Sequence, residues 1–419
     1  MIITSTLKRA LKKIIPHKVI IKVRLIIDYI PSKLNNIMCK RKYISLYDTR
    51  INNSCIKVGF IVQMPEIWDK QLPLFDALVH NERFHPVLIS IPAYDFTNKI
   101  VKTNYDDDFF LKKYPEYCIK AYEDDRWLSI RELGLDYIFY QRPYDWYLPK
   151  ELQSTTISYH TRCCYIPYAF WPFKYDLCGY NRPFFRSLYF GFIESKENCE
   201  EIIRLGDYEA MHRYLFCGYP SLDKKDDYSS NDSSNTTTIL WTPRWSYDIN
   251  VGGSHFFEYK DKILNLLNEF EGIELILRPH PLSFQNYVLM GKITEGEVET
   301  YKRNVLESGA SFDQNRAIDD TFRNTDILIT DISSILYTYI LYEKPIIFCN
   351  TTVPKSPSFE SIMECMYMAD TWDDVVYWIC EIRNGNDELK DKRHRLAEKI
   401  RLENRGAIDN IISHLIKGK

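Results

Sequence analysis

Apolar and polar residues alternate along most of the chain in the order typical of a parallel α/β protein. From Lys57 onward, short apolar runs that end in turn residues alternate with segments of helical period. Such alternation predicts parallel strands covered by helices. In the first half we predict strands at 57–63, 84–92, 136–141, 164–170 and 214–220, and a helix at 70–80.

The second half repeats this alternation more regularly. A polar tract from Asp227 to Thr238 has no apolar period and is predicted to be a linker. Beyond it we predict strands at 239–242, 273–277, 327–330 and 345–348, and helices at 256–270, 317–323 and 334–341. The expected domains are an α/β domain at 51–226, the linker at 227–238, a second doubly wound α/β domain at 239–385 and a carboxyl-terminal helix at 386–419, which could cross back over the first domain.

Residues 1–50 differ from the rest in charge. Eleven Lys or Arg residues and the single acid Asp28 fall within residues 1–43, and the apolar residues from Leu7 to Ile15 follow a helical period. This pattern predicts a basic amphipathic segment that lies on an anionic membrane surface. A helix packed on its own domain, with a solvated charged face, is the alternative.

Composition narrows the class of protein. The chain has 419 residues, of which 45% are hydrophobic and 26% are charged, and a formal net charge of −3. These values predict a folded protein of two or three domains without a nucleic-acid partner. The eleven cysteines form no C-x-x-C motif, and no run of eighteen apolar residues is present. We therefore expect a cytoplasmic protein, peripherally associated with the inner face of the cell membrane, without disulfides or a zinc site.

Polar residues directly follow the predicted strands of the second domain. In open parallel sheets, ligands bind beyond the carboxyl ends of the strands, so these residues are the candidate site. They are Thr242 and Arg244 after the first strand, Arg278 and His280 after the second, and Thr330, Asp331, Ser333 and Ser334 at the end of the third.

The residue types at these strand ends suit a phosphate-bearing ligand. The planar guanidinium of Arg278 can bind two phosphate oxygens, and His280 can donate a proton to a leaving phosphate. Ser333 and Ser334 stand where a strand gives way to a helix, which favours an anion, although simple helix capping explains them equally well. Arg244 stands between two tryptophans that either hold a base or pack beneath a loop.

Four motifs resemble one enzyme family. "CGYPSLD", "ILWTPRWS", "RPHP" and "TDISSILYTYILYEKPIIF" occur in this order over residues 215–350. In this combination the chain resembles the CDP-glycerol glycerophosphotransferases of teichoic-acid and capsule synthesis. The resemblance implies a GT-B fold, with two Rossmann-like domains facing a cleft, and a donor-phosphate role for His280, Ser333 and Ser334. Bacterial sialyltransferases pair similar motifs to hold a cytidine nucleotide, so the resemblance supports cytidine more firmly than glycerol.

The sequence departs from this family in two places. Its polymerases carry W-H-G-T-P in the first domain, where this chain has "YQRPYDWYLP" and "SYHTRCCYIPYAF". The catalytic base is therefore unassigned, and Asp145 and His160 are the candidates. The family also has an aromatic-Asp step after the serine pair, where this chain has Tyr337 and Thr338.

Together these features predict a peripheral membrane transferase of the bacterial cell envelope. It would move glycerol phosphate or a similar polyol phosphate from a CDP-activated donor to a lipid-linked or polymeric glycan acceptor, with no metal or other cofactor. A glycosyltransferase that uses a CMP- or UDP-sugar is one alternative, and a non-catalytic scaffold that retains the nucleotide pocket is another. The acceptor, the choice of polyol or sugar, priming against polymerisation and the oligomeric state stay open.

Overall fold

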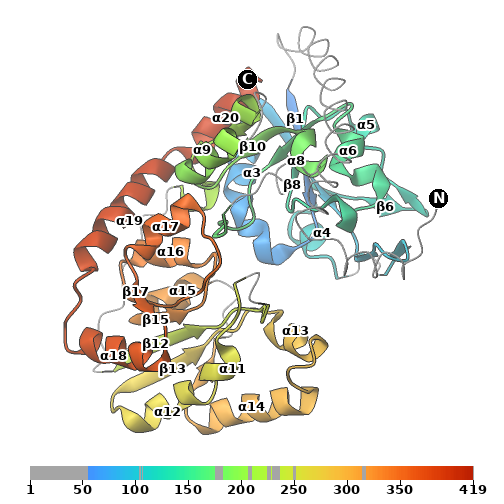
Figure 1. Ribbon diagram of the computed structural model, residues 1–419. Helices are drawn as coiled ribbons and strands as arrows, with labels where there is room; N and C mark the ends of the chain where they lie inside the picture. Colours follow the sequence, from blue (N-terminus) through green and yellow to red (C-terminus); the bar gives the residue numbers. More distant parts are fainter. Residues whose placement is uncertain are drawn as a thin grey trace, which may run out of the picture. The chain divides into compact units, whose positions relative to one another are not determined.

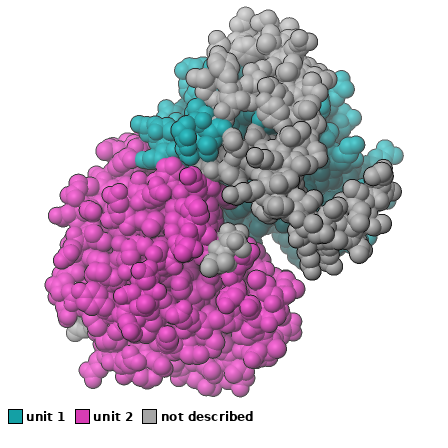
Figure 2. Space-filling model, viewed as in Figure 1, with its two compact units in different colours: residues 1–168, 175–223, 406–419 teal, residues 169–174, 224–405 magenta. Residues whose placement is uncertain are grey.

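A computed structural model describes residues 55–102, 105, 107–174, 183–205, 210–223, 228, 236–248, 252–313 and 318–418. The basic segment predicted at 1–50 lies outside these described residues. The chain divides into two compact units, coloured separately in Figure 2. Unit 1 comprises residues 1–168, 175–223 and 406–419, and unit 2 comprises residues 169–174 and 224–405.

Unit 1 is built on a seven-stranded sheet in the order β11-β10-β9-β8-β1-β2-β5. Its strands β1, β8 and β10 are labelled in Figure 1. Its strands are β1 (Ile56–Val62), β2 (Phe84–Ser90), β5 (Cys118–Lys120), β8 (Tyr137–Tyr140), β9 (Arg162–Tyr165), β10 (Leu188–Phe192) and β11 (Tyr214–Leu215). All neighbouring strands are parallel. Every residue of β8 is buried, as expected of a strand covered on both faces. The strand predicted at 164–170 ends earlier because Pro167 cannot donate a ladder hydrogen bond.

Short helices connect the strands of unit 1, and two small antiparallel ribbons lie outside its sheet. The ribbons pair β3 (Tyr94–Asp95) with β4 (Ile100–Val101) and β6 (Tyr122–Glu123) with β7 (Arg126–Trp127). The α-helices are α3 (Leu72–Val79), α4 (Phe109–Lys113), α5 (Ile130–Leu133), α6 (Ser154–Ile157), α8 (Pro183–Ser187), α9 (Lys196–Leu205), α10 (Ala210–Arg213) and α20 (Ala407–Lys417). The 3-10 turns among the described residues of this unit are η1 (Pro65–Lys70), η2 (Asp145–Tyr147), η3 (Lys150–Leu152) and η4 (Pro220–Leu222).

The carboxyl-terminal helix α20 is part of unit 1. The hydroxyl of Tyr137 in β8 donates to the carbonyl of Leu415 at 2.9 Å. The Asp223 carboxylate accepts from the backbone N–H groups of Gly406, at 3.0 Å, and Ile408, at 2.9 Å, at the start of the helix. The chain thus returns to its first sheet after completing unit 2.

Unit 2 is built on a six-stranded sheet in the order β14-β13-β12-β15-β16-β17. Its strands are β12 (Thr237–Thr242), β13 (Ile273–Leu277), β14 (Ser311–Phe312), β15 (Ile327–Thr330), β16 (Ile346–Cys349) and β17 (Tyr367–Ala369). All are parallel to their neighbours, so the prediction of two doubly wound sheets is confirmed.

Helices alternate with these strands. They are α11 (Phe256–Tyr259), α12 (Lys262–Glu269), α13 (Ser283–Leu289), α14 (Glu295–Glu307), α15 (Ile318–Asn324), α16 (Leu336–Tyr339), the 3-10 turn η6 (Ile340–Tyr342), α17 (Pro357–Met363), α18 (Trp372–Arg383) and α19 (Lys390–Asn404). Among the described residues, no helix combines the length and apolar character needed to cross a bilayer.

Six residues from the first half of the sequence, 169–174, belong to unit 2. The ring of Phe170 stacks on the buried Tyr337 in α16, with centroids 3.5 Å apart. The backbone N–H of Lys174 donates to the carbonyl of Pro354 at 3.0 Å. These contacts bring an aromatic segment beside the strand ends of unit 2.

Both sheets share one connection pattern. In unit 1 the chain runs from β1 out to β2 and β5, then returns to β8 beside β1 and continues outward to β9, β10 and β11. In unit 2 it runs from β12 out to β13 and β14, then returns to β15 beside β12. The loops after the two central strands therefore diverge, and this switch point is where ligands bind in such sheets.

Candidate functional site

The switch point of unit 2 begins with two threonines that bond to each other. Thr242 ends β12 and Thr330 ends β15, and the two are paired in register. Their hydroxyls are 2.7 Å apart and both residues are buried. Thr330 also donates to the carbonyl of Asp331 at 2.8 Å. These hydroxyls tie the central strands together where the loops diverge.

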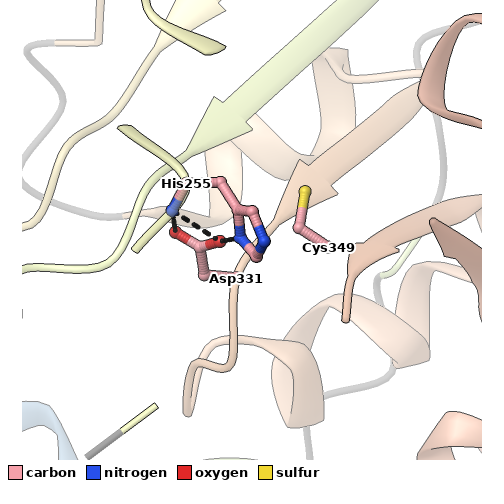
Figure 3. A group of neighbouring side chains, drawn as sticks. All are labelled: His255, Asp331 and Cys349. Atoms are coloured by element: carbon pink, nitrogen blue, oxygen red, sulfur yellow. Dashed lines mark hydrogen bonds and ion pairs between the residues drawn. The ribbon is translucent and has the colours of Figure 1, made fainter. Parts of the chain in front are cut away.

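Asp331 organises the loops around this point. Its carboxylate accepts from the backbone N–H of Arg244 at 2.8 Å. It also accepts from Nδ1 of His255 at 2.6 Å (Figure 3). The hydroxyl of Ser254 donates to it as well, at 3.3 Å. Burial alone would lower the pKa of His255, but the hydrogen bond and the charge of Asp331 outweigh it and raise that pKa. Asp331 therefore favours the protonated form of the His255 imidazole.

Arg244 is a fixed cation at the same edge. Its Nη1 donates to the carbonyl of Ile332 at 2.7 Å, and its guanidinium carbon lies 4.9 Å from the centre of the Phe173 ring. Burial lowers its pKa and the charge of Asp331 partly offsets this. Gly252 has a φ of +106°, and a Cβ there would lie 2.6 Å from the Ile332 side chain and 3.1 Å from Nε of Arg244. Glycine therefore lets the next loop pack directly on this arginine.

His280 and Arg278 follow β13. The Nδ1 of His280 accepts from the backbone N–H of Leu282 at 3.2 Å, so in the neutral ring Nε2 carries the hydrogen and is a donor. The ring is exposed at its edge, yet the surrounding protein and the charge of Arg244 lower its pKa. Arg278 instead forms an ion pair with the buried carboxylate of Asp313. The structure thus leaves His280 as a neutral donor and directs Arg278 toward the outer strand β14.

Ser333 and Ser334 lie in the loop between β15 and α16, and both are partly buried. The hydroxyl of Ser333 accepts from the backbone N–H of Ile335 at 3.4 Å. The helix predicted at 334–341 is shorter, since α16 spans Leu336–Tyr339 and gives way to the turn η6. A helix of this length has a small dipole, so an anion at this position would be held more by hydroxyl and amide donors than by the dipole.

One group of potential metal ligands lies beneath this loop among the described residues. One ligand atom each from His255, Asp331 and Cys349 lie within 4.8 Å of one another (Figure 3). The Asp331 carboxylate is already bonded to N–H groups of Arg244 and His255. Burial raises the pKa of Cys349 well above its usual value, which favours the thiol over the thiolate that binds metals. Hydrogen bonds therefore account for the arrangement.

Comparison with known proteins gives one family match, which begins in unit 1 and includes the strand ends of unit 2. Residues 195–353 match the family described as CDP-glycerol:poly(glycerophosphate) glycerophosphotransferase. The chain contains a domain of this family. The predicted class of enzyme, a glycerophosphotransferase-family transferase, is confirmed at this level. The match includes every strand-end residue predicted in unit 2, from Thr242 to Ser334. A search of curated proteins found no match.

Solved structures show the fold of the chain. S. aureus MnaA, in a co-structure with UDP, is 14% identical, with a TM-score of 0.54 over 86% of this chain and 96% of that chain. The UDP-GlcNAc 2-epimerase from Neisseria meningitidis, bound to UDP-GlcNAc, is 10% identical, with a TM-score of 0.54 over 86% and 100%. The wall teichoic acid polymerase TagF is 16% identical, with a TM-score of 0.49 over 94% and 97%. The predicted GT-B-like fold of two Rossmann-like units is confirmed.

The two candidate bases, Asp145 and His160, lie in unit 1. The Asp145 carboxylate accepts from the backbone N–H of Ser154 at 2.9 Å and from its hydroxyl at 2.8 Å, at the start of α6. Burial raises the pKa of Asp145. His160 precedes β9, at the amino-terminal edge of the sheet, with its Nδ1 3.0 Å from the Thr161 hydroxyl. Asp145 therefore follows the carboxyl end of β8, whereas His160 precedes the amino end of β9.

Sequence reasoning missed His255. Its signal was present, because it follows two glycines and stands just before a predicted helix. A single histidine in a loop carries no sign of its partner, however, and Asp331 lies 76 residues away. Only the sheet topology, which places β12 beside β15, predicts that the two loops meet.

Proposed function

We propose that this protein transfers a glycerol phosphate, or a similar polyol phosphate, from a CDP-activated donor to a lipid-linked or polymeric cell-surface glycan, and releases CMP. One observation carries the proposal. The glycerophosphotransferase-family match spans the whole switch point of unit 2, where Arg244 and the Nε2–H of His280 follow neighbouring strands. A diphosphate needs such donors at a sheet edge.

In the reaction, an acceptor hydroxyl attacks the distal phosphorus of the donor. A new P–O bond forms as the bond to the CMP oxygen breaks, and CMP leaves with that electron pair. A base takes the hydroxyl proton, and Asp145 and His160 stay the predicted candidates. Catalysis then rests on alignment and on stabilising the charge of the leaving phosphate.

Each residue at the unit 2 edge has a role in this scheme. Arg244 and His280 stabilise the leaving phosphate, and the hydroxyls of Ser333 and Ser334 bind its oxygens. Asp331 positions Arg244 through its backbone N–H. Arg278, paired with Asp313, orders the loop that carries His280, while the paired hydroxyls of Thr242 and Thr330 hold the two central strands in register.

Nucleotide release from a panel of donors tests the proposal. The purified full-length chain is incubated with an acceptor extract and CDP-glycerol, CDP-ribitol, a CMP-sugar or a UDP-sugar. We expect CMP only from the CDP-polyols, and a rate about 10²- to 10⁴-fold lower for His280→Ala. His85→Ala, at an exposed position of β2, is the matched control. Turnover with sugar donors alone would identify a glycosyltransferase, and unchanged CMP release by His280→Ala would remove the proposed site.

A further inference from the structure

The switch point of unit 1 has its own cluster of polar residues. Gln63 directly follows β1, and Gln141 and Arg142 directly follow β8. The two strands are parallel neighbours, so the three residues share the carboxyl edge of the sheet. This is the position at which ligands bind in doubly wound sheets. The glycerophosphotransferase-family match begins at residue 195 and does not include it.

Gln141 fixes the backbone here. Its buried side-chain oxygen accepts from the backbone N–H groups of Gln63, at 2.7 Å, and Met64, at 2.9 Å. Its amide nitrogen donates to the carbonyl of Met64 at 3.1 Å. The loop after β1 is thus bound to the loop after β8 by three hydrogen bonds, all made by neutral groups. Such a loop is rigid before any ligand arrives.

Arg142 projects from this rigid edge as a half-buried cation. Its Nη2 donates to the side-chain oxygen of Gln63 at 2.5 Å, and its guanidinium carbon lies 4.6 Å from the centre of the Tyr147 ring. Within the described part of the chain, no carboxylate pairs with it, and no acceptor is found for its Nε or Nη1. Desolvation lowers its pKa, and only the tyrosines around it act in the opposite direction. A partly desolvated charge without a counter-ion is costly, so an anion is the natural complement.

Aromatic residues surround the guanidinium. The hydroxyls of Tyr144 and Tyr168 are 3.1 Å apart, and either can donate to a further acceptor. The ring of Trp146 lies against Tyr144, with centroids 4.8 Å apart, and 47% of its surface is exposed. Hydroxyl donors beside a cation suit phosphate oxygens, and an exposed aromatic face suits the carbon skeleton of a polyol or sugar.

We propose that Arg142, held by Gln63 and flanked by Tyr144 and Tyr168, binds a phosphate group of the acceptor chain. The acceptor is then a polymer or lipid-linked glycan that already carries a phosphate ester near the hydroxyl that reacts. The planar fork of arginine gives two parallel hydrogen bonds to such a group. This inference rests on the proposed function for the identity of the acceptor, but the phosphate site itself is testable without turnover.

Calorimetry on the purified full-length protein tests the site. The probe is a short synthetic glycerol-phosphate oligomer, with an uncharged oligoglycerol of equal length and inorganic phosphate as comparisons. We expect the oligomer to bind more tightly than either, and Arg142→Gln to weaken it about 10- to 100-fold while CDP-glycerol affinity is unchanged. Arg142→Lys keeps the charge without the fork and should weaken binding less. Arg131→Gln, exposed in α5, is the matched control and should have no effect.

The outcomes separate the two proposals. Thermal unfolding first checks that Arg142→Gln and Arg142→Lys are folded. If both variants bind the oligomer as tightly as the parent while CDP-glycerol is still consumed, the phosphate site is refuted and the proposed function stands. Equal binding of oligomer and uncharged oligoglycerol refutes it too. If the protein binds no CDP compound but loses oligomer affinity in Arg142→Gln, the site stands and the proposed function fails.

Discussion

The two switch points place a cation at the same topological position but support it differently. In unit 2, a carboxylate, Asp331, holds the backbone N–H of Arg244 and the ring of His255. In unit 1, a neutral amide, Gln141, accepts from the backbone N–H of Gln63, whose side chain in turn accepts from Arg142. The unit 2 site therefore combines three charged groups. The unit 1 site has a single charged group, Arg142, among amides and hydroxyls.

This difference teaches how a site for an anion can tolerate a buried carboxylate. Asp331 alone would repel a phosphate, but the raised pKa of His255 keeps a proton beside it and balances its charge. The charge of Arg244 then remains for the ligand. Unit 1 presents the same net charge without a proton that can be lost. We therefore expect the donor site to depend on its ion pair and on pH, and the acceptor site to depend on neither.

Replacing the carboxylate of unit 2 by an amide should give the largest effect. Asp331→Asn makes this edge resemble unit 1 in shape but leaves His255 without its counter-charge in a buried setting. We expect the free energy of unfolding to fall by about 3 kcal/mol, as measured by denaturant unfolding. Asp373→Asn, exposed in the first turn of α18, should cost less than about 1 kcal/mol. Equal stability of Asp331→Asn and the parent would show that the pair has no organising role.

For the strand ends of unit 2, the sequence predicts the sheet topology better than it predicts the contacts and roles of individual side chains. Alternating apolar runs place Thr242, Arg244 and His280 at strand ends, because a parallel sheet brings all carboxyl ends to one edge. The same pattern does not show that the hydroxyls of Thr242 and Thr330 bond to each other, or that Asp331 faces protein groups. Those contacts depend on side-chain directions in loops, which carry no periodic signal.

Arg142 shows most clearly what the sequence does not predict. In the sequence it is one arginine among aromatic residues, in a segment that differs from the family's W-H-G-T-P motif. Its role depends on two facts that appear only in three dimensions: β8 lies beside β1, and no described carboxylate forms an ion pair with the guanidinium, whose titratable neighbours are tyrosines. A missing partner cannot be inferred from a linear sequence, because any of the chain's acidic residues could have supplied one.

A carboxylate introduced into unit 1 should give an intermediate effect. Gln63→Glu places an acid where the amide oxygen now accepts from Arg142 at 2.5 Å. The new ion pair would neutralise the guanidinium and occupy one arm of its fork, so oligomer affinity should fall about tenfold in calorimetry. Gln285→Glu, exposed on unit 2, adds the same charge elsewhere and should leave oligomer affinity unchanged. An unaltered affinity in Gln63→Glu would argue that the oligomer does not reach Arg142.

The smallest expected effect is the response of the two sites to pH. His255 has a raised pKa in the folded protein, so its ion pair with Asp331 is complete below about pH 6.5 and is lost as pH rises through the folded pKa. Its other neighbours are Glu258, Tyr259 and Cys349. The pKa of Tyr259 and of Cys349 is raised by burial, so both stay neutral in this range. Glu258, as an anion, favours the same proton.

CDP-glycerol affinity should therefore fall as pH rises from 6.5 to the point at which His255 has lost its proton, because the charge of Asp331 then faces the diphosphate without a compensating proton. Its diphosphate diester has no group that titrates in this range, so the change reports on the protein. Oligomer affinity should stay flat over the same range, because Arg142 keeps its charge. His255→Gln should remove the dependence for CDP-glycerol. A dependence that persists in that variant would assign the proton to another group and break the contrast between the two switch points.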